Sequence, residues 1–148
     1  MFASPWSPAF IPLFGQTLTL NQLEHSLILE PGVFDEPRLH FAVNCTSVGC
    51  PALRSSALVA GTLDEQLDDS QQRFLSDRSH NRFDAASGRF RVSEIFDCYG
   101  EDFARRWGSL EDYLRQQPTR VTTEQLGQAA NPPKVEFLDY DWPLNPSS

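Results

Sequence analysis

The sequence predicts an α+β fold in which several helices pack on a small mixed sheet. The clearest helical pattern covers residues 63 to 77, where apolar side chains recur every three or four positions. Alternation with a period of two, which is typical of strands, occurs at residues 39 to 44 and again at 89 to 92. We expect the strand at 39 to 44 to lie at the centre of the sheet.

The N-terminal residues 1 to 18 are predicted to form a proline-rich arm. Three prolines lie there among aromatic and aliphatic residues, a mixture too apolar for a flexible tail and too rich in proline for a helix interior. Thr19 and Gln22 then fit a capping box, which predicts a helix near residues 20 to 29. Residues 19 to 148 are expected to form a single domain.

Two helix starts and one late extended segment complete the expected fold. Thr62 and Glu65 fit a second capping box in front of the helix at 63 to 77. Ser93 is placed to cap a short helix after the strand at 89 to 92. The apolar and aromatic residues from 135 to 142 predict a closing strand at the edge of the sheet.

Composition excludes several classes of function. A net charge of −8 argues against nucleic acid or anionic lipid as a partner. No apolar run approaches the roughly 20 residues that cross a bilayer, so we expect no membrane span. The first residues lack the basic and apolar regions of a secretory signal. The chain as written is therefore expected to be cytoplasmic, although a longer form could be extracytoplasmic.

The strongest candidate for chemistry is the segment from Leu39 to Cys45. On a strand, His40 and Asn44 would share one face, with the small Ala42 between them, and could line one groove. An imidazole next to a thiol can hold the thiolate as an ion pair and later return the proton to a leaving group. Cys45 or the nearby Cys50 could supply that thiol. The alternative is that His40 is a partly buried polar residue with a structural role.

The three cysteines allow at most one intramolecular disulfide. Cys45 and Cys50 could form it, in which case neither is a nucleophile, and Cys98 is expected to fill the core. Because a second pair of metal ligands is missing, we expect no metal and no cofactor. Asp102 could orient a histidine or cap a backbone group.

Four motifs in order resemble the uncharacterised family catalogued as domain of unknown function 547. The resemblance spans about residues 18 to 145, and it implies no activity, because none is established for the family. Members carry an upstream helix with a Trp-Asn-Tyr-Asn type motif, so the chain resembles the later part of the domain. The matching stretches are residues 37–45 with 50–53, 63–67 with 73–75, 92–103, and 137–145.

Two functions fit these residues. A strand-borne histidine with an amide resembles the layout of papain-like and transglutaminase-like hydrolases. This layout implies a thiol hydrolase or acyltransferase with His40 as base, Cys45 or Cys50 as nucleophile, and Asn44 or Asp102 as orienter. The alternative is a non-catalytic domain that binds a peptide or protein. A surface left uncovered by an absent upstream half would also favour self-association.

Overall fold

The structure is a computed structural model, and it describes residues 4–84, 86–117 and 134–145. Three strands form a mixed sheet in the order β3 (Arg82–Asp84), β4 (Arg89–Ser93) and β5 (Lys134–Leu138). β3 pairs antiparallel with β4, whereas β5 pairs parallel with β4. The predicted α+β class, the small mixed sheet and the closing strand at its edge are confirmed.

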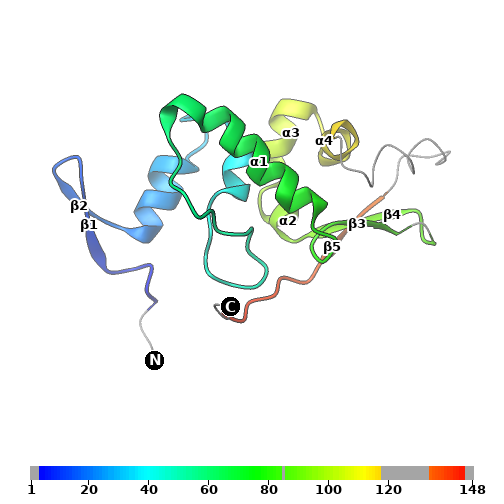
Figure 1. Ribbon diagram of the computed structural model, residues 1–148, viewed down its shortest axis with the longest axis horizontal. Helices are drawn as coiled ribbons and strands as arrows, with labels where there is room; N and C mark the ends of the chain where they lie inside the picture. The colour runs from blue at the N-terminus through cyan, green and yellow to red at the C-terminus, as the bar shows by residue number, and fades with distance from the viewer. Residues whose placement is uncertain (1–3, 85, 118–133, 146–148) are drawn as a thin grey trace.

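In the described residues, four α-helices accompany this sheet, and Figure 1 shows α1, α3 and α4 above it. The long helix α1 (Leu63–Ser76) confirms the helix predicted from apolar spacing. The short helices are α2 (Ile95–Cys98), α3 (Gly100–Trp107) and α4 (Leu110–Gln116). Among the described residues, no helix has the length and apolarity that a membrane crossing requires.

The two predicted capping boxes have different outcomes. Between Thr19 and Gln22 the bonds are reciprocal, since each backbone N–H donates to the other side chain at 3.0 Å. This box starts the π-helix η1 (Gln22–Ile28). Thr62 makes no side-chain capping bond, because a 3-10 turn, η3 (Ala60–Thr62), leads directly into α1. The prediction of a capping box at Thr62 and Glu65 was therefore wrong, although the helix that it was expected to start is present.

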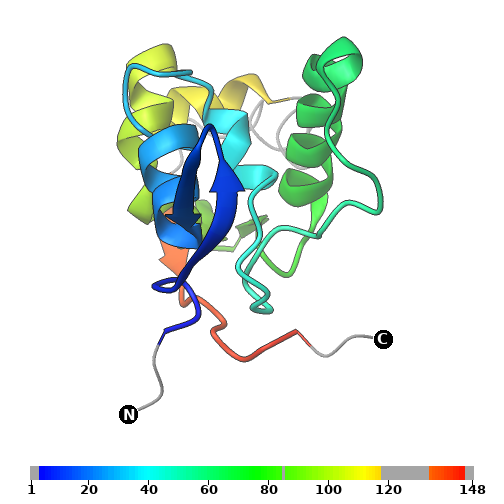
Figure 2. The ribbon, with the colours of Figure 1, turned by 90° about the vertical axis from the view of Figure 1, so that its left-hand side faces the viewer.

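The N-terminal arm is extended as expected, but it folds back on itself. Strands β1 (Ala9–Leu13) and β2 (Gln16–Thr19) form an antiparallel hairpin. Figure 1 shows this hairpin beside η1 at one end of the molecule, and Figure 2 shows it in front, facing the viewer. Phe14 is in the turn with a positive φ of 51° and is 85% exposed. The domain division at residue 18 stays a prediction.

The predicted central strand at residues 39 to 44 was wrong. Pro37 to Phe41 form a 3-10 helix, η2, and the centre of the sheet is β4. Proline at the first position favours a helical turn because its φ is already fixed near the helical value. The Glu36 side chain adds a cap by accepting a bond from Arg38 N at 3.1 Å. Six alternating residues were too short a pattern to outweigh these start signals.

The core is largely aromatic, and η2 contributes to its centre. Phe41, 1% exposed, lies 5.2 Å from Phe74 of α1 and 5.7 Å from Phe103 of α3, measured between ring centroids. Phe103 in turn lies 4.7 Å from Tyr113 of α4 and 5.2 Å from Phe96 of α2. These tilted and offset pairs match the geometry that aromatic rings prefer. The turn at η2 is therefore packed between helices from both halves of the chain.

Phe96→Ala should lower the free energy of unfolding by about 3–5 kcal/mol, because it removes a ring that is 1% exposed from the middle of this cluster. Phe14→Ala is the matched control: its ring is 85% exposed, and the change should stay within about 0.5 kcal/mol. Urea unfolding followed by circular dichroism measures both. Similar losses in the two variants would contradict the packing described here.

Candidate functional site

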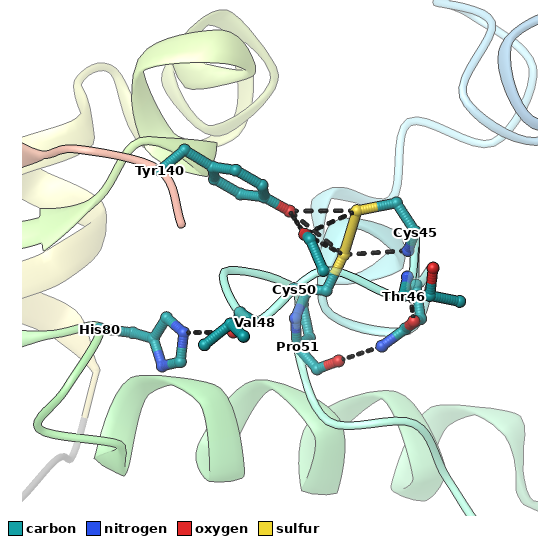
Figure 3. Close-up of a disulfide and its surroundings, with 9 residues drawn as sticks. Cys45, Thr46, Val48, Cys50, Pro51, His80 and Tyr140 are labelled. Carbon is teal, nitrogen blue, oxygen red and sulfur yellow. Dashed lines mark hydrogen bonds between the residues drawn. A yellow bond between two sulfur atoms is a disulfide. The ribbon is translucent and has the colours of Figure 1, made fainter. Parts of the chain in front are cut away.

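Cys45 and Cys50 form a disulfide that closes a short loop after η2 (Figure 3). This is one of the two alternatives that the sequence left open. The Tyr140 hydroxyl lies 3.2 Å from Cys45 Sγ and 3.1 Å from Cys50 Sγ, and the Ser47 hydroxyl donates to it at 3.1 Å. The sulfurs therefore lie beside two hydroxyl groups, one from the loop and one from the C-terminal segment.

The C-terminal segment reaches the disulfide because it runs along this loop. Gly49 N donates to Asp141 O at 2.9 Å, and Val48 N donates to Pro143 O at 2.9 Å. A Cβ atom at Gly49 would lie 3.0 Å from both Asp141 N and a ring carbon of Tyr140. Glycine is thus required for the close approach that positions Tyr140.

Asn44 does not share a surface with His40, as a strand would have required. Its Nδ2 donates to Pro51 O at 2.6 Å, and its Oδ1 accepts from Thr46 N at 2.7 Å. Thr46 has a positive φ of 69°. Both ends of the Asn44 amide therefore hold the loop in shape. Within the described residues, the Asn44 side chain forms no hydrogen bond with the His40 imidazole.

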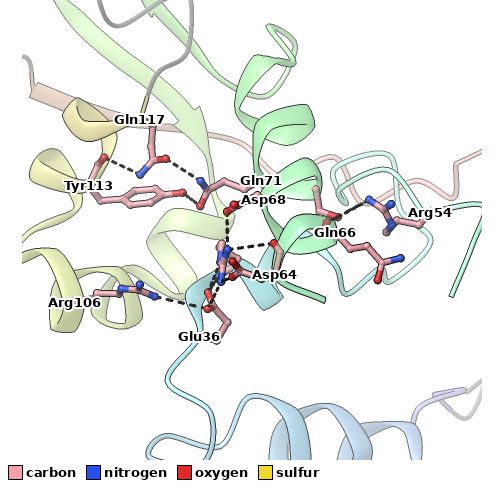
Figure 4. Close-up of polar contacts among 11 residues, drawn as sticks. Glu36, Arg54, Asp64, Gln66, Asp68, Gln71, Arg106, Tyr113 and Gln117 are labelled. Atoms are coloured by element: carbon pink, nitrogen blue, oxygen red, sulfur yellow. Dashed lines mark hydrogen bonds and ion pairs between the residues drawn. The ribbon is translucent and has the colours of Figure 1, made fainter. Parts of the chain in front are cut away.

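Ion pairs tie η2 to the neighbouring helices (Figure 4). The Arg38 guanidinium lies 2.7 Å from Glu36, 2.6 Å from Asp64 and 2.6 Å from Asp68, so it joins the turn to the start of α1. Glu36 also lies 3.7 Å from Arg106 of α3. The carboxylates facing Arg38 raise its pKa further above its usual range. The Arg38–Glu36 pair is mostly buried on both sides, so it is screened less than an ordinary surface pair, whereas Asp64 and Asp68 are largely exposed. Together these pairs hold the turn that carries His40.

His40 is held from two sides by residues of the α2–α3 region. Its Nε2 lies 2.7 Å from Asp102 Oδ2, and the Tyr99 ring stacks on the imidazole at 4.0 Å between centroids. The other carboxylate oxygen of Asp102 pairs with Arg105. The His40 side chain is 3% exposed. A carboxylate pinned at both oxygens and a stacked ring leave the imidazole one orientation.

Burial lowers the pKa of His40, and the nearby Asp102 only partly opposes this shift. The imidazole is therefore neutral near pH 7, with one ring nitrogen protonated. Since a carboxylate only accepts, Nε2 carries that hydrogen and Nδ1 keeps its lone pair. No hydrogen bond to Nδ1 occurs among the described residues. Nδ1 is also not fully enclosed, because in this part of the chain Arg54 Nε is the one fully enclosed side-chain nitrogen or oxygen without a partner. His40 thus offers an unused acceptor that is not fully enclosed.

His40 and the disulfide line the same hollow, which we call the aromatic hollow. It has a volume of about 330 Å³. His40 also lines a second hollow of about 360 Å³, together with Asp102 and Arg105. Among the described residues, no group of His, Cys, Asp or Glu is arranged to hold a metal ion. The walls of the aromatic hollow include Trp6, Glu24, Glu94, Tyr99, Tyr140 and Trp142.

Sequence reasoning missed Tyr99 as part of the site, although a signal was present. Tyr99, Asp102 and Phe103 have the spacing i, i+3, i+4, which places side chains on one face of a helix. All three contact His40 in the structure. Cys98 was expected to fill the core, but it is exposed and lines the aromatic hollow.

The family described as "Protein of unknown function, DUF547" matches residues 3–75. This stretch is DUF547-like. The DUF547-like stretch contains the hairpin, η1, η2, the disulfide loop and nearly all of α1. It confirms the resemblance to this family, while the motifs at residues 92–103 and 137–145 lie beyond the match. Asp102, Tyr99 and Tyr140 lie beyond it. No curated protein and no solved structure gives a significant match to the chain.

His40 should make the protein less stable in weak acid. The unfolded chain binds a proton at His40 near the ordinary pKa of 6.5, whereas the folded chain resists protonation until a lower pH. The stabilisation is therefore complete above pH 6.5 and is lost as the pH falls, with a slope of at most about 1.4 kcal/mol per pH unit. Urea unfolding at a series of pH values above the carboxylate range measures this slope.

His40→Gln should flatten that slope, because glutamine can still donate to Asp102 but does not titrate. His25→Gln, at an exposed position of η1, is the matched control. A slope that survives in His40→Gln would show that His40 is not a buried neutral imidazole.

Proposed function

We propose that the aromatic hollow is the active site of a thiol hydrolase or acyltransferase, with His40 as the general base and Asp102 as the residue that orients it. The observation that supports this most is that an oriented, neutral imidazole and the Cys45–Cys50 pair line the same hollow. Such an imidazole can accept a proton and return it, which is the role of the base in nucleophilic catalysis.

The proposed nucleophile is Cys45 or Cys50 after reduction of the disulfide by a thiol reductant. His40 accepts the thiol proton, and the thiolate attacks the carbonyl carbon of an ester or amide. The leaving group takes the proton from the imidazolium, and a thioester remains on the enzyme. Water or another acceptor then attacks the thioester and releases the thiol. The neighbouring Tyr140 and Ser47 hydroxyls are suited to donate to the developing oxyanion.

The proposed site differs from a papain-like or transglutaminase-like layout. There the histidine is on a strand and the cysteine begins a helix, whereas here His40 is on a 3-10 turn and both candidate cysteines are in a loop. The proposal therefore depends on the local geometry of this chain and not on that layout.

The second candidate function is a non-catalytic domain that binds a peptide or protein. It is favoured by the disulfide, which occupies both sulfurs, and by the low exposure of the His40 side chain, 3%. In this case the His40–Asp102 contact and the loop hold the hollow in shape for a ligand.

Alkylation of the reduced protein by iodoacetamide, resolved by mass spectrometry from about pH 5 to about pH 9, separates the two functions. We expect Cys45 or Cys50 to react well below pH 8. Cys98 is the internal control, because burial and the nearby Glu94 and Asp97 raise the pKa of its thiol. It should react only at higher pH.

His40→Ala should abolish the low-pH reaction and lower any ester hydrolysis by about 100-fold or more, since the base is lost. His25→Ala removes another imidazole from the same hollow and should leave both unchanged. Slow labelling that is indifferent to His40 would reject the hydrolase and leave the binding domain.

A further inference from the structure

Four aromatic rings from distant parts of the chain line the aromatic hollow. Trp6 precedes the hairpin, Tyr99 lies between α2 and α3, and Tyr140 and Trp142 belong to the C-terminal segment. The last two rings lie 4.7 Å apart between centroids, at 55°. Trp142 is 74% exposed although it is a large apolar residue. Faces of this kind attract either apolar groups or cations, because the ring face carries partial negative charge.

The charged side chains of this hollow decide between those two ligands. Its lining contains the carboxylates of Glu24 on η1 and Glu94 before α2, and within the described part of the chain it contains no lysine or arginine. After burial, Glu24 is the largest cause of the raised pKa of Tyr99, so its charge acts directly at this wall. The neighbouring hollow differs, because two guanidinium groups, those of Arg105 and Arg106, lie among its four carboxylates and could pair with an anion.

A hydrogen bond holds the Glu94 carboxylate in place, so its negative charge has a defined position in the hollow. Its Oε2 accepts from Tyr140 N at 2.8 Å, so the same contact holds the carboxylate and the aromatic segment. His40 adds no opposing charge, since burial keeps it neutral near pH 7. An anionic ligand would therefore face two carboxylates without a compensating lysine or arginine.

From this combination of rings and carboxylates we infer that the aromatic hollow binds the alkylammonium group of an amine. The rings and the two carboxylates both favour a positive charge, and a volume of about 330 Å³ accepts a group of that size. The role of the amine as part of a substrate rests on the proposed function, with the acyl group directed towards His40. The binding itself does not require catalysis.

Isothermal titration of the intact chain with matched probes tests this inference. The probes are n-butylammonium for a free amine, Nα-acetyl-lysine methylamide for a lysine side chain, and n-pentanol and pentanoate as neutral and anionic counterparts of similar size. We expect both ammonium probes to bind more tightly than either counterpart, and salt to weaken them. The tighter of the two ammonium probes identifies the source of the group.

Glu24→Gln should weaken butylammonium binding about fivefold, as the loss of one partly buried charge interaction predicts. Glu30→Gln is the matched control, because Glu30 follows the same helix but lines the other hollow. Trp142→Ala, at a position that is 74% exposed, should also weaken binding without affecting folding. Pentanol or pentanoate binding as tightly as the ammonium probes, or Glu24→Gln binding normally, would overturn the inference.

The same titration in His40→Ala separates the two proposals. Unchanged ammonium binding together with lost ester hydrolysis supports both. Ammonium binding in a wild-type chain that never hydrolyses esters under reducing conditions supports the inference and rejects the proposed enzyme. Ester hydrolysis without preference for the ammonium probes rejects the inference alone.

Discussion

The buried contact between His40 on η2 and Asp102 on α3 is the interaction on which the rest of the site depends. It joins residues 62 positions apart, and the stacked Tyr99 ring adds a second constraint from the same region. The next residue, Phe41, packs into the aromatic core between α1 and α3. One short turn therefore links the aromatic core to the candidate site, because Phe41 packs in the core and the adjacent His40 lines the aromatic hollow.

Two features keep this turn in place from outside. Arg38 and Glu36 connect it to α1 and α3 by ion pairs, and the disulfide closes the loop that follows it. The C-terminal segment then packs along the loop at Gly49 and brings Tyr140 to the sulfurs. The aromatic hollow is thus assembled from the first residues, the middle of the chain and its C-terminal segment, and its shape depends on contacts across the whole sequence.

Local signals in the sequence predicted the elements that local interactions determine. The apolar spacing of α1, the alternation of β4 and the capping box at Thr19 and Gln22 all have partners within a few residues. The segment from 39 to 44 was misread because alternation over six residues is compatible with a turn once Pro37 and Glu36 start one.

The candidate site was only partly predictable for the same reason. His40, Cys45 and Cys50 stood out by residue type, and Asp102 was named as an orienter, but nothing local showed that it reaches His40. Asn44 was predicted to orient the base, but its side chain is hydrogen-bonded within the loop. Tyr140 comes to the disulfide through the parallel pairing of β5 with β4 and through the contacts of the C-terminal segment with the loop, and no short window of sequence contains either.

The most direct test of this account is the protonation state of the His40 ring, measured by nitrogen-15 NMR on the labelled protein near pH 7. The account predicts a neutral ring with hydrogen on Nε2, facing Asp102, and a bare Nδ1 that can serve as the base. His40→Gln assigns the signals. A ring protonated on Nδ1, or an imidazolium at this pH, would contradict the account, because His40 would then have no lone pair to offer in the hollow.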